Sequence, residues 1–197
     1  RDMKTPIGFQ LDYSQLDTHL PPGQLRPMLD QTVKPFMYTS IPIQRACGED
    51  DVCVPDLSLS IYSATTVYTY GTELDLTITI NLVNQGEDAY LGTLSMNIPN
   101  FVQYRGIKLI QGERAPICDK LEINLLDTKS KYGQSEMICE TGNPYQKLQN
   151  STYILSLRIE KYDVPEKLEA IIFTIKANSS NDEAGDTIDD NIASLHI

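Results

Sequence analysis

Acidic side chains are the groups in this sequence best suited to binding a ligand. The seven-residue segment at positions 47–53 begins and ends with cysteine and contains three consecutive carboxylates, Glu49, Asp50 and Asp51. A closed loop holds carboxylate and carbonyl oxygens in fixed directions, and Ca²⁺ requires about six to eight oxygen ligands. Because the loop is too small to supply them all, a further carboxylate must come from elsewhere, and Glu87 is a candidate. The residues alone favour the simpler alternative of a solvated acidic loop.

A second acidic stretch lies near the end of the sequence. It contains Asp182, Glu183, Asp186, Asp189 and Asp190. The spacing does not match the EF-hand pattern D-x-[DN]-x-[DN]-G, in which alternate positions carry the Ca²⁺ ligands. We therefore interpret this stretch as a solvated hairpin loop whose charges keep a sheet edge soluble.

No catalytic motif is found in the sequence. The two histidines, His19 and His196, have no triad context such as GxSxG. Neither GxGxxG nor GxxxxGK[ST] occurs, so nucleotide binding has no support. A formal net charge of −11 opposes binding to the phosphate backbone of nucleic acids. No basic amphipathic stretch indicates contact with a membrane surface. The sequence thus predicts a protein that is not an enzyme.

The four cysteines are an even set without a CxxC pair: Cys47, Cys53, Cys118 and Cys139. They allow three pairings, and joining sequence neighbours closes the shortest loops. Loop closure would then contribute about 2.4 kcal/mol for the first pair and about 3.4 kcal/mol for the second. The alternative is four reduced, buried cysteines in a cytosolic protein. Sequons at Asn150 and Asn178 favour an extracellular protein, because both fit the N-glycosylation pattern.

Alternation of apolar and polar residues is the dominant pattern of the chain. From Leu74 to Leu82 every second residue is apolar, which predicts a long antiparallel strand with one buried face. The same alternation recurs over residues 57–61, 94–98, 121–125, 153–159, 171–177 and 192–196, with His196 expected to face inward or to lie at the end of a cut strand. Turn signals such as Asn84-Gln85-Gly86 separate these runs, and Arg105-Gly106-Ile107 is interpreted as a turn at a strand end. No segment has a convincing helical period, so we predict an all-β, two-sheet antiparallel β-sandwich.

The first 46 residues have a different character and contain six of the eleven prolines. Residues 10–13 and 36–44 could be strands, joined by a long Pro-rich loop. A piece of this size is too small to form such a sandwich alone, so we interpret it as the last strands of an upstream domain. Arg1 is not an initiator Met, and the sequence ends at Ile197 in apolar, strand-like sequence, so we expect an excerpt of a longer protein.

Several motifs, in order, resemble integrin α chains. The run Cys47-Gly48-Glu49-Asp50-Asp51-Val52-Cys53-Val54-Pro55-Asp56-Leu57 resembles the knee of that family, where the thigh domain meets calf-1. Further similarities lie at Leu11-Asp12-Tyr13, at Leu25-Arg26-Pro27-Met28-Leu29-Asp30-Gln31, at Asn84-Gln85-Gly86-Glu87-Asp88-Ala89-Tyr90 and at Cys139-Glu140-Thr141-Gly142-Asn143-Pro144. The sequence departs from the family pattern at Glu140-Thr141, where Asp-Leu is usual, and at Asp51, where Asn is common.

The resemblance implies a domain organisation and a site. Residues 1–46 would be the C-terminal part of an Ig-like thigh domain, 47–53 the knee (genu) disulfide loop, and 54–197 the calf-1 β-sandwich, which is related to Ig-like domains. Disulfides would join Cys47 to Cys53 and Cys118 to Cys139. One Ca²⁺ at the knee would be bound by the side chains of Asp50 and Glu87 and by the backbone carbonyls of Cys47 and Val52.

The resemblance also implies a function without catalysis. The segment would lie in the extracellular part of a single-pass cell-surface receptor and would space the ligand-binding head from the membrane. It would take part in the change from a bent to an extended form. The partner would be an integrin β subunit, and an extracellular-matrix ligand would bind through a head region outside this sequence. The alternative is a secreted carbohydrate-binding β-sandwich module or a glycosidase accessory domain, although the sequence has no Trp for a sugar-binding face.

Overall fold

A computed structural model describes most of the chain, with side chains as well as backbone. The described residues are 5–15, 23, 25, 28, 30, 32–43, 45, 47–50, 52–69, 75–121, 134–159, 170–185 and 187–197, except for the side chains of residues 120, 121 and 134. The expected strand positions Leu74, Ile123 and Leu125 lie outside these residues, as do His19, Asp51 and Asp186. The chain divides into two compact units, Arg1–Gln44 and Arg45–Ile197.

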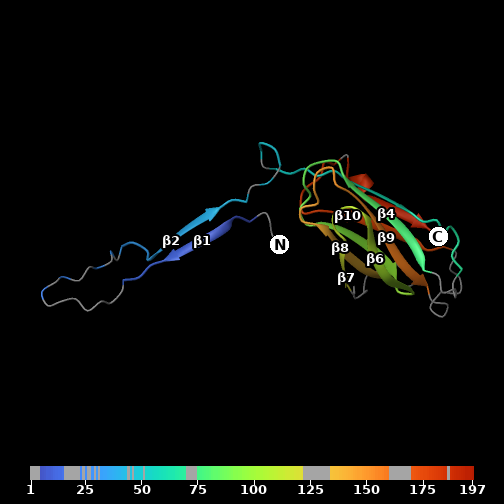
Figure 1. Cartoon of the computed structure of the whole chain (residues 1–197), viewed down its shortest axis with the longest axis horizontal. Helices are drawn as coiled ribbons and strands as arrows, with labels where there is room; N and C mark the ends of the chain where they lie inside the picture. Colours follow the sequence, from blue (N-terminus) through green and yellow to red (C-terminus); the bar gives the residue numbers. More distant parts are fainter. Residues whose placement is uncertain are drawn as a thin grey trace. The chain divides into compact units, whose positions relative to one another are not determined.

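The first unit contains an antiparallel pair of strands, β1 (Ile7–Asp12) and β2 (Phe36–Ile41) (Figure 1). Ile7 lies opposite Ile41, and Leu11 lies opposite Met37. Together with Phe9 these side chains form one apolar face, because residues two apart on a strand share a face. All five are between 48% and 65% exposed. A two-stranded sheet is marginally stable by itself, and the described residues of this unit leave its apolar face about half exposed.

The second unit consists of two antiparallel sheets. The four-stranded sheet has the order β3-β4-β9-β6, and the five-stranded sheet has the order β11-β10-β5-β8-β7 (Figure 1). The bounds are β3 (Leu57–Tyr62), β4 (Leu76–Asn84), β5 (Gly92–Pro99), β6 (Val102–Gln111), β7 (Ile117–Leu121), β8 (Gln134–Gly142), β9 (Asn150–Ile159), β10 (Ile172–Asn178) and β11 (Ile192–His196). A short 3₁₀ turn, η1 (Ile188–Asn191), precedes β11. The predicted all-β, antiparallel sandwich is therefore confirmed.

The core lies between the two sheets, where alternate residues of each strand meet. Leu76, Ile78, Ile80 and Leu82 of β4 are all at most 1% exposed. They pack in one cluster with residues from the five-stranded sheet, including Leu94, Met96, Phe173 and Ile175. Burying apolar surface stabilises the fold by about 25 cal/mol per Å², so the alternation read from the sequence corresponds directly to the main source of stability.

Two strand-level expectations were wrong. The inward side chains of β11 are Ala193 and Leu195, which pack against the core, whereas His196 is exposed and is the last residue of the strand, so the inward expectation for it was wrong. The inward phase of this short strand is thus shifted by one residue. Arg105-Gly106-Ile107 does not end a strand but lies inside β6, where the register with β9 shifts at Tyr104 and Gly106. Gly106 adopts φ +148° there, and the bulge removes the regular alternation by which strands are found in a sequence.

Candidate functional site

The disulfide loop at residues 47–53 is closed by a bond between Cys47 and Cys53. Both cysteines are buried, at 1% and 4% exposure, whereas Glu49 and Asp50 between them are exposed. Asp50 Oδ1 accepts a hydrogen bond of 3.1 Å from the backbone N–H of Val52. The cysteines therefore anchor the loop to the second unit, while the carboxylates of Glu49 and Asp50 remain accessible to an ion from solvent.

The turn after β4 lies directly against the chain that leaves this loop. A Cβ atom on Gly86 would lie 2.6 Å from the carbonyl carbon of Pro55 and 2.7 Å from the carbonyl oxygen of Val54. Real Cβ atoms do not approach backbone this closely, so only glycine fits at position 86 without a shift of one of the two segments. The consequence is that the next residue, Glu87, is placed beside the loop.

Glu87 forms a reciprocal pair of hydrogen bonds with Val54. The backbone N–H of Glu87 donates to the carbonyl of Val54 at 3.0 Å, and the N–H of Val54 donates to Glu87 Oε2 at 3.1 Å. The other carboxylate oxygen, Oε1, would lie 3.5 Å from a Cβ on Gly48. A carboxylate 33 residues away in sequence is thus held at the mouth of the disulfide loop, next to Gly48 and facing the loop that carries Asp50.

Asn84 holds this arrangement together from inside the fold. Its side chain is 0% exposed and accepts hydrogen bonds through Oδ1 from the N–H groups of Asp56 and Gly86, at 3.1 and 3.2 Å. Through Nδ2 it donates to the carbonyls of Glu87, Tyr145 and Gln146, at 2.7, 3.1 and 3.1 Å. One buried amide thereby joins the strand that follows the disulfide loop, the turn that carries Glu87, and the loop after β8.

Sequence reasoning did not identify this role of Asn84. In the sequence it is only the first residue of a turn motif, and Asn is common in turns for local reasons. Its partners at Asp56 and Tyr145 are far away along the chain, and no sequence pattern marks them. A polar residue at the end of a buried apolar run was the one available signal.

The second acidic stretch is not a uniformly solvated loop. Asp182, Asp189 and Asp190 are exposed, as the interpretation required, but Glu183 is half-buried. Glu183 Oε1 accepts from the N–H of Leu57 at 2.8 Å, and Oε2 accepts from Asn191 Nδ2 at 2.6 Å. The carboxylate therefore fastens the segment before β11 to the start of β3, a structural role that the sequence interpretation missed.

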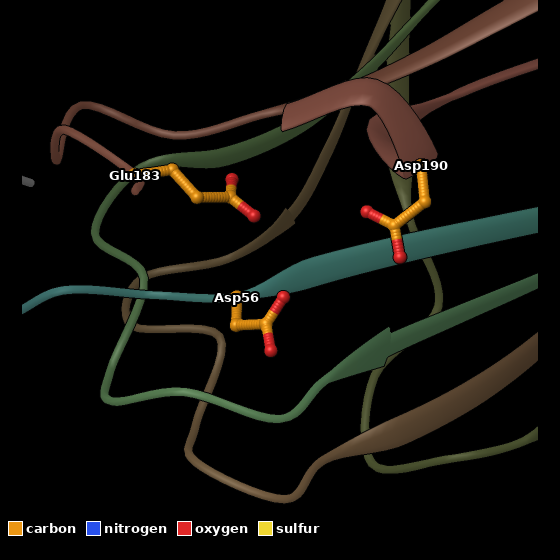
Figure 2. Close-up of side chains that lie close together, drawn as sticks. All are labelled: Asp56, Glu183 and Asp190. Carbon is orange, nitrogen blue, oxygen red and sulfur yellow. The ribbon is translucent and has the colours of Figure 1, made fainter. Parts of the chain in front are cut away.

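Glu183 also approaches two other carboxylates. One carboxylate oxygen from each of Asp56, Glu183 and Asp190 lies within 4.8 Å of the others. Figure 2 shows the three side chains directed toward a common space, from the residue before β3, from the loop after β10 and from η1. One member of this cluster is close in sequence to the disulfide loop, since Asp56 follows Cys53 by three residues.

Three tyrosines among the described residues have pKa values raised by burial. Desolvation raises the pKa of Tyr145, Tyr153 and Tyr104 above the ordinary value. Tyr145 is completely buried and donates its hydroxyl hydrogen to the carbonyl of Leu82 at 2.8 Å, so its role is structural.

Both sequon asparagines, Asn150 at the start of β9 and Asn178 at the end of β10, are exposed. A second disulfide, between Cys118 and Cys139, joins β7 to β8.

These features define a class of protein: an antiparallel β-sandwich with Ig-like architecture that contains disulfide bonds. The family model described as integrin alpha Ig-like domain 2 matches residues 47–197. Since the match covers more than half of the sequence, the chain belongs to the integrin α family.

Individual relatives extend the similarity to the first unit. The chain is 30% identical over its whole length to integrin alpha pat-2 of Caenorhabditis elegans, of which it covers 16%. It is 31% identical over its whole length to human integrin alpha-8, of which it covers 18%, and 27% identical over 93% of its length to human integrin alpha-IIb, of which it covers 16%. The chain thus spans less than a fifth of the length of these relatives.

Comparison with solved structures adds little. The major pilin subunit BcpA of Bacillus cereus is similar over 72% of this chain and 38% of its own, at 11% identity and a TM-score of 0.36. A score this low supports no conclusion about function.

Family membership places the chain in the leg of an integrin α subunit, within the extracellular part of a single-pass cell-surface protein. The relatives named above are integrin α chains, not carbohydrate-binding modules. Within the described ranges, no helix is long and apolar enough to cross a membrane.

Proposed function

We propose that this segment acts as a mechanical part of an integrin α subunit. It spaces the ligand-binding head from the membrane and takes part in the change between bent and extended forms of the receptor. Residues 1–46 form the end of the thigh domain, 47–53 the knee loop and 54–197 the calf-1 domain. Two observations support this division: the chain divides into its two compact units between Gln44 and Arg45, and the family match begins at Cys47.

The knee loop is proposed to bind one Ca²⁺. The residues fit such an ion because Glu87 is held beside the loop, with Oε1 3.5 Å from the position that a Cβ on Gly48 would occupy. Asp50 is exposed in the same loop, and the carbonyls of Cys47 and Val52 supply the neutral oxygen ligands that Ca²⁺ accepts. The approach of Glu87 to the disulfide loop is the observation that carries the proposal. When bound, the ion supplies electrostatic cross-linking between the loop and the turn at Gly86.

The remaining contacts belong to the larger receptor. An integrin β subunit is the proposed partner, and a matrix ligand binds through the head region, outside this segment. No catalytic, nucleic-acid-binding or membrane-binding role is proposed here. Asn150 and Asn178 are proposed to carry N-linked glycans, since both side chains are exposed and stand in sequons.

Calorimetric titration of Ca²⁺ into the 197-residue chain tests the knee site. Glu87→Gln keeps an oxygen that can accept from the Val54 N–H and removes only the charge, so the expected effect is at least tenfold weaker Ca²⁺ binding. Asp50→Asn should act similarly. Glu49→Gln, in the same loop but outside the proposed ligand set, is the matched control and should change affinity less than about threefold, as expected for an exposed charge. The knee assignment fails if neither ligand variant differs from the control.

The mechanical role is tested in the full-length receptor. Negative-stain electron microscopy of the heterodimer in Ca²⁺ should show a changed ratio of bent to extended particles in the Glu87→Gln variant. An unchanged ratio, with Ca²⁺ binding lost in the titration, would separate the ion from the conformational change.

A further inference from the structure

A hollow of about 400 Å³ lies on the outer face of the five-stranded sheet, at the end of β10. Three of its lining residues, Ile192, Lys176 and Ser95, stand opposite one another on β11, β10 and β5. The loop after β10, residues 179–183, and the short turn η1 also line it. The volume falls within the range of about 300–1,000 Å³ that small-molecule sites occupy, so the hollow can hold a ligand of sugar size.

Asn178 lines the same hollow and is the first residue of the sequon Asn178-Ser179-Ser180. It follows Lys176 by two residues on β10 and shares its face of the sheet, because side chains alternate along a strand. Its Oδ1 accepts a hydrogen bond of 2.9 Å from the N–H of Ser179. The other amide atom, Nδ2, is the atom to which an N-linked glycan is attached. The first sugar of such a glycan therefore begins at the hollow itself.

Hydrogen bonds to other parts of the fold hold the loop that lines the hollow. The N–H of Ser180 donates to the carbonyl of Tyr90 at 2.8 Å, and the N–H of Tyr90 donates to Asn181 Oδ1 at 2.8 Å. Asn181 Nδ2 donates to the carbonyl of Cys53 at 3.1 Å. A site that is already ordered loses little conformational entropy when a ligand occupies it. The same loop is bonded to the end of the disulfide loop, so a ligand in the hollow also acts on that segment.

The side chains of the hollow suit a neutral carbohydrate. Ile188 and Ile192 are 45% and 46% exposed, and they offer aliphatic surface to the C–H faces of a sugar ring. Lys176 and Asp182 are exposed and offer a hydrogen-bond donor and an acceptor to its hydroxyl and N-acetyl groups. Because charges of both signs line the hollow, a neutral polar ligand fits it better than an ion of either sign.

We propose that the first sugars of an N-linked glycan on Asn178 lie in this hollow and pack on Ile188 and Ile192. The inference rests on the proposed glycosylation of Asn178 and assigns that glycan a place and a structural role. The glycan covers aliphatic surface that is otherwise in contact with water, which is favourable, and it joins β10 to η1. Because the loop after β10 is bonded to the carbonyl of Cys53, the glycan also stabilises the end of the disulfide loop.

Nuclear magnetic resonance tests the position of the glycan directly. The 197-residue chain is secreted from an animal cell line with labelled isoleucine, and its glycans are trimmed enzymatically to the first N-acetylglucosamine. Nuclear Overhauser effects should connect protons of the sugar on Asn178 with the methyl groups of Ile188 and Ile192. They should disappear in Asn178→Gln and persist in Asn150→Gln. Their absence from a chain whose Asn178 is glycosylated overturns the proposal.

Urea unfolding tests the structural role. Asn178→Gln should lower the midpoint of unfolding by about 0.5 M relative to the glycosylated chain. Asn150→Gln is the matched control, because Asn150 is also an exposed sequon residue but lies at the start of β9, in the other sheet. It should change the midpoint by less than about 0.2 M. Equal losses in the two variants contradict a role for the hollow.

A double-mutant cycle connects the stabilisation to the side chains of the hollow. Ile192→Ser removes aliphatic surface from a half-exposed position, so the chain should still fold. In this background, loss of the Asn178 glycan should lower the midpoint by at most about half as much as in wild type, since contacting residues are not additive. An undiminished effect of the glycan contradicts packing on Ile192.

Glycopeptide mass spectrometry separates failure of this inference from failure of the proposed glycosylation. An unmodified Asn178 in the secreted chain refutes the glycosylation and this inference together. An occupied Asn178 without contacts between the sugar and the two isoleucines refutes only the place assigned to the glycan, and the attachment site stands.

Discussion

Replacing Asn84 with alanine should destabilise the second unit more than any exposed substitution on the same strand. The mutation leaves the N–H groups of Asp56 and Gly86 without the acceptor that they now share. It also removes the donor that serves the carbonyls of Glu87 and Tyr145. Because the side chain is 0% exposed, solvent cannot replace these bonds unless the site opens.

The expected cost follows from the two orphaned donors. A buried donor without a partner costs about 1–3 kcal/mol. A polar network can contribute more to stability than the sum of its separate hydrogen bonds. We therefore expect a loss of about 3–5 kcal/mol, a large fraction of the roughly 5–15 kcal/mol by which such domains are stable. With a urea m-value of about 2 kcal/mol/M, the midpoint of unfolding should fall by about 2 M.

Urea unfolding followed by circular dichroism measures this change, with equal m-values required before midpoints are compared. Asn81→Ala is the matched control on β4. Asn81 is half-buried, and among the described residues its side chain forms hydrogen bonds with Ser60 at 3.5 Å and with Thr152 at 3.0 Å. Its replacement should cost at most about 1 kcal/mol. Equal losses in the two variants would refute the role assigned to Asn84.

Asn84→Asp tests whether the side chain at position 84 must donate to the carbonyls of Glu87 and Tyr145. The introduced carboxyl keeps the acceptor for Asp56 and Gly86 but directs its second oxygen at carbonyl oxygens. The folded state then favours the protonated form, which raises the pKa of this carboxyl above its ordinary value of about 3.9. The variant's loss of stability relative to wild type should be smallest at pH values below the ordinary carboxyl pKa. It should grow as the pH rises through the raised pKa of the folded state. A deficit independent of pH between 3 and 8, roughly one unit below to four above the ordinary value, would contradict this geometry.

Further substitutions test the packing around the site, the burial of Tyr145 and the second disulfide. Gly86→Ala should cost about 1–3 kcal/mol through overpacking against the Pro55 backbone, whereas Gly185→Ala, whose Cβ would meet open space, should cost less than about 0.5 kcal/mol in the same urea experiment. Burial raises the pKa of Tyr145, so wild-type stability should be complete below pH ~10 and fall above it, because the unfolded state ionises first. Tyr145→Phe should cost about 1 kcal/mol at pH 8 and weaken that alkaline decline, measured as urea midpoints up to pH ~11. Replacing the disulfide pair that joins β7 to β8 with two alanines should cost about 3 kcal/mol, since its 21-residue separation no longer limits the unfolded chain; a loss below about 1 kcal/mol would contradict the loop-closure argument.

The sandwich was predictable where strands are regular and one face is fully buried. β4 is the clearest case, because Leu76 to Leu82 alternate without interruption and the buried face is unambiguous. β6 was not predictable, since bulges at Gly106 and near Leu109 break the period of two. The phase of β11 was missed because Ile192 and Leu195 suggest opposite faces, and only the packing of the sheets decides between them.

The site was predictable only in part, for a different reason. Glu87 was identified as a possible partner of the disulfide loop because its carboxylate is visible in the sequence and the family resemblance supplies the pairing. Asn84 and Glu183 were not identified, because their importance comes from backbone groups that other segments leave unpaired. Which N–H groups lack a partner is a property of the folded chain, and residue types alone do not contain it.

Side chains from separate parts of the fold form hydrogen bonds with backbone groups of residues 53–57, the segment at the end of the disulfide loop and directly after it. These side chains are Asn181, Glu87, Asn84 and Glu183. A pulling force along this segment is shared among all of these bonds, so they must rupture together. A strand peeled from a sheet edge loses its bonds one at a time and yields at a much lower force. Under tension, this part of the chain should therefore be among the last to lengthen, and extension should begin elsewhere.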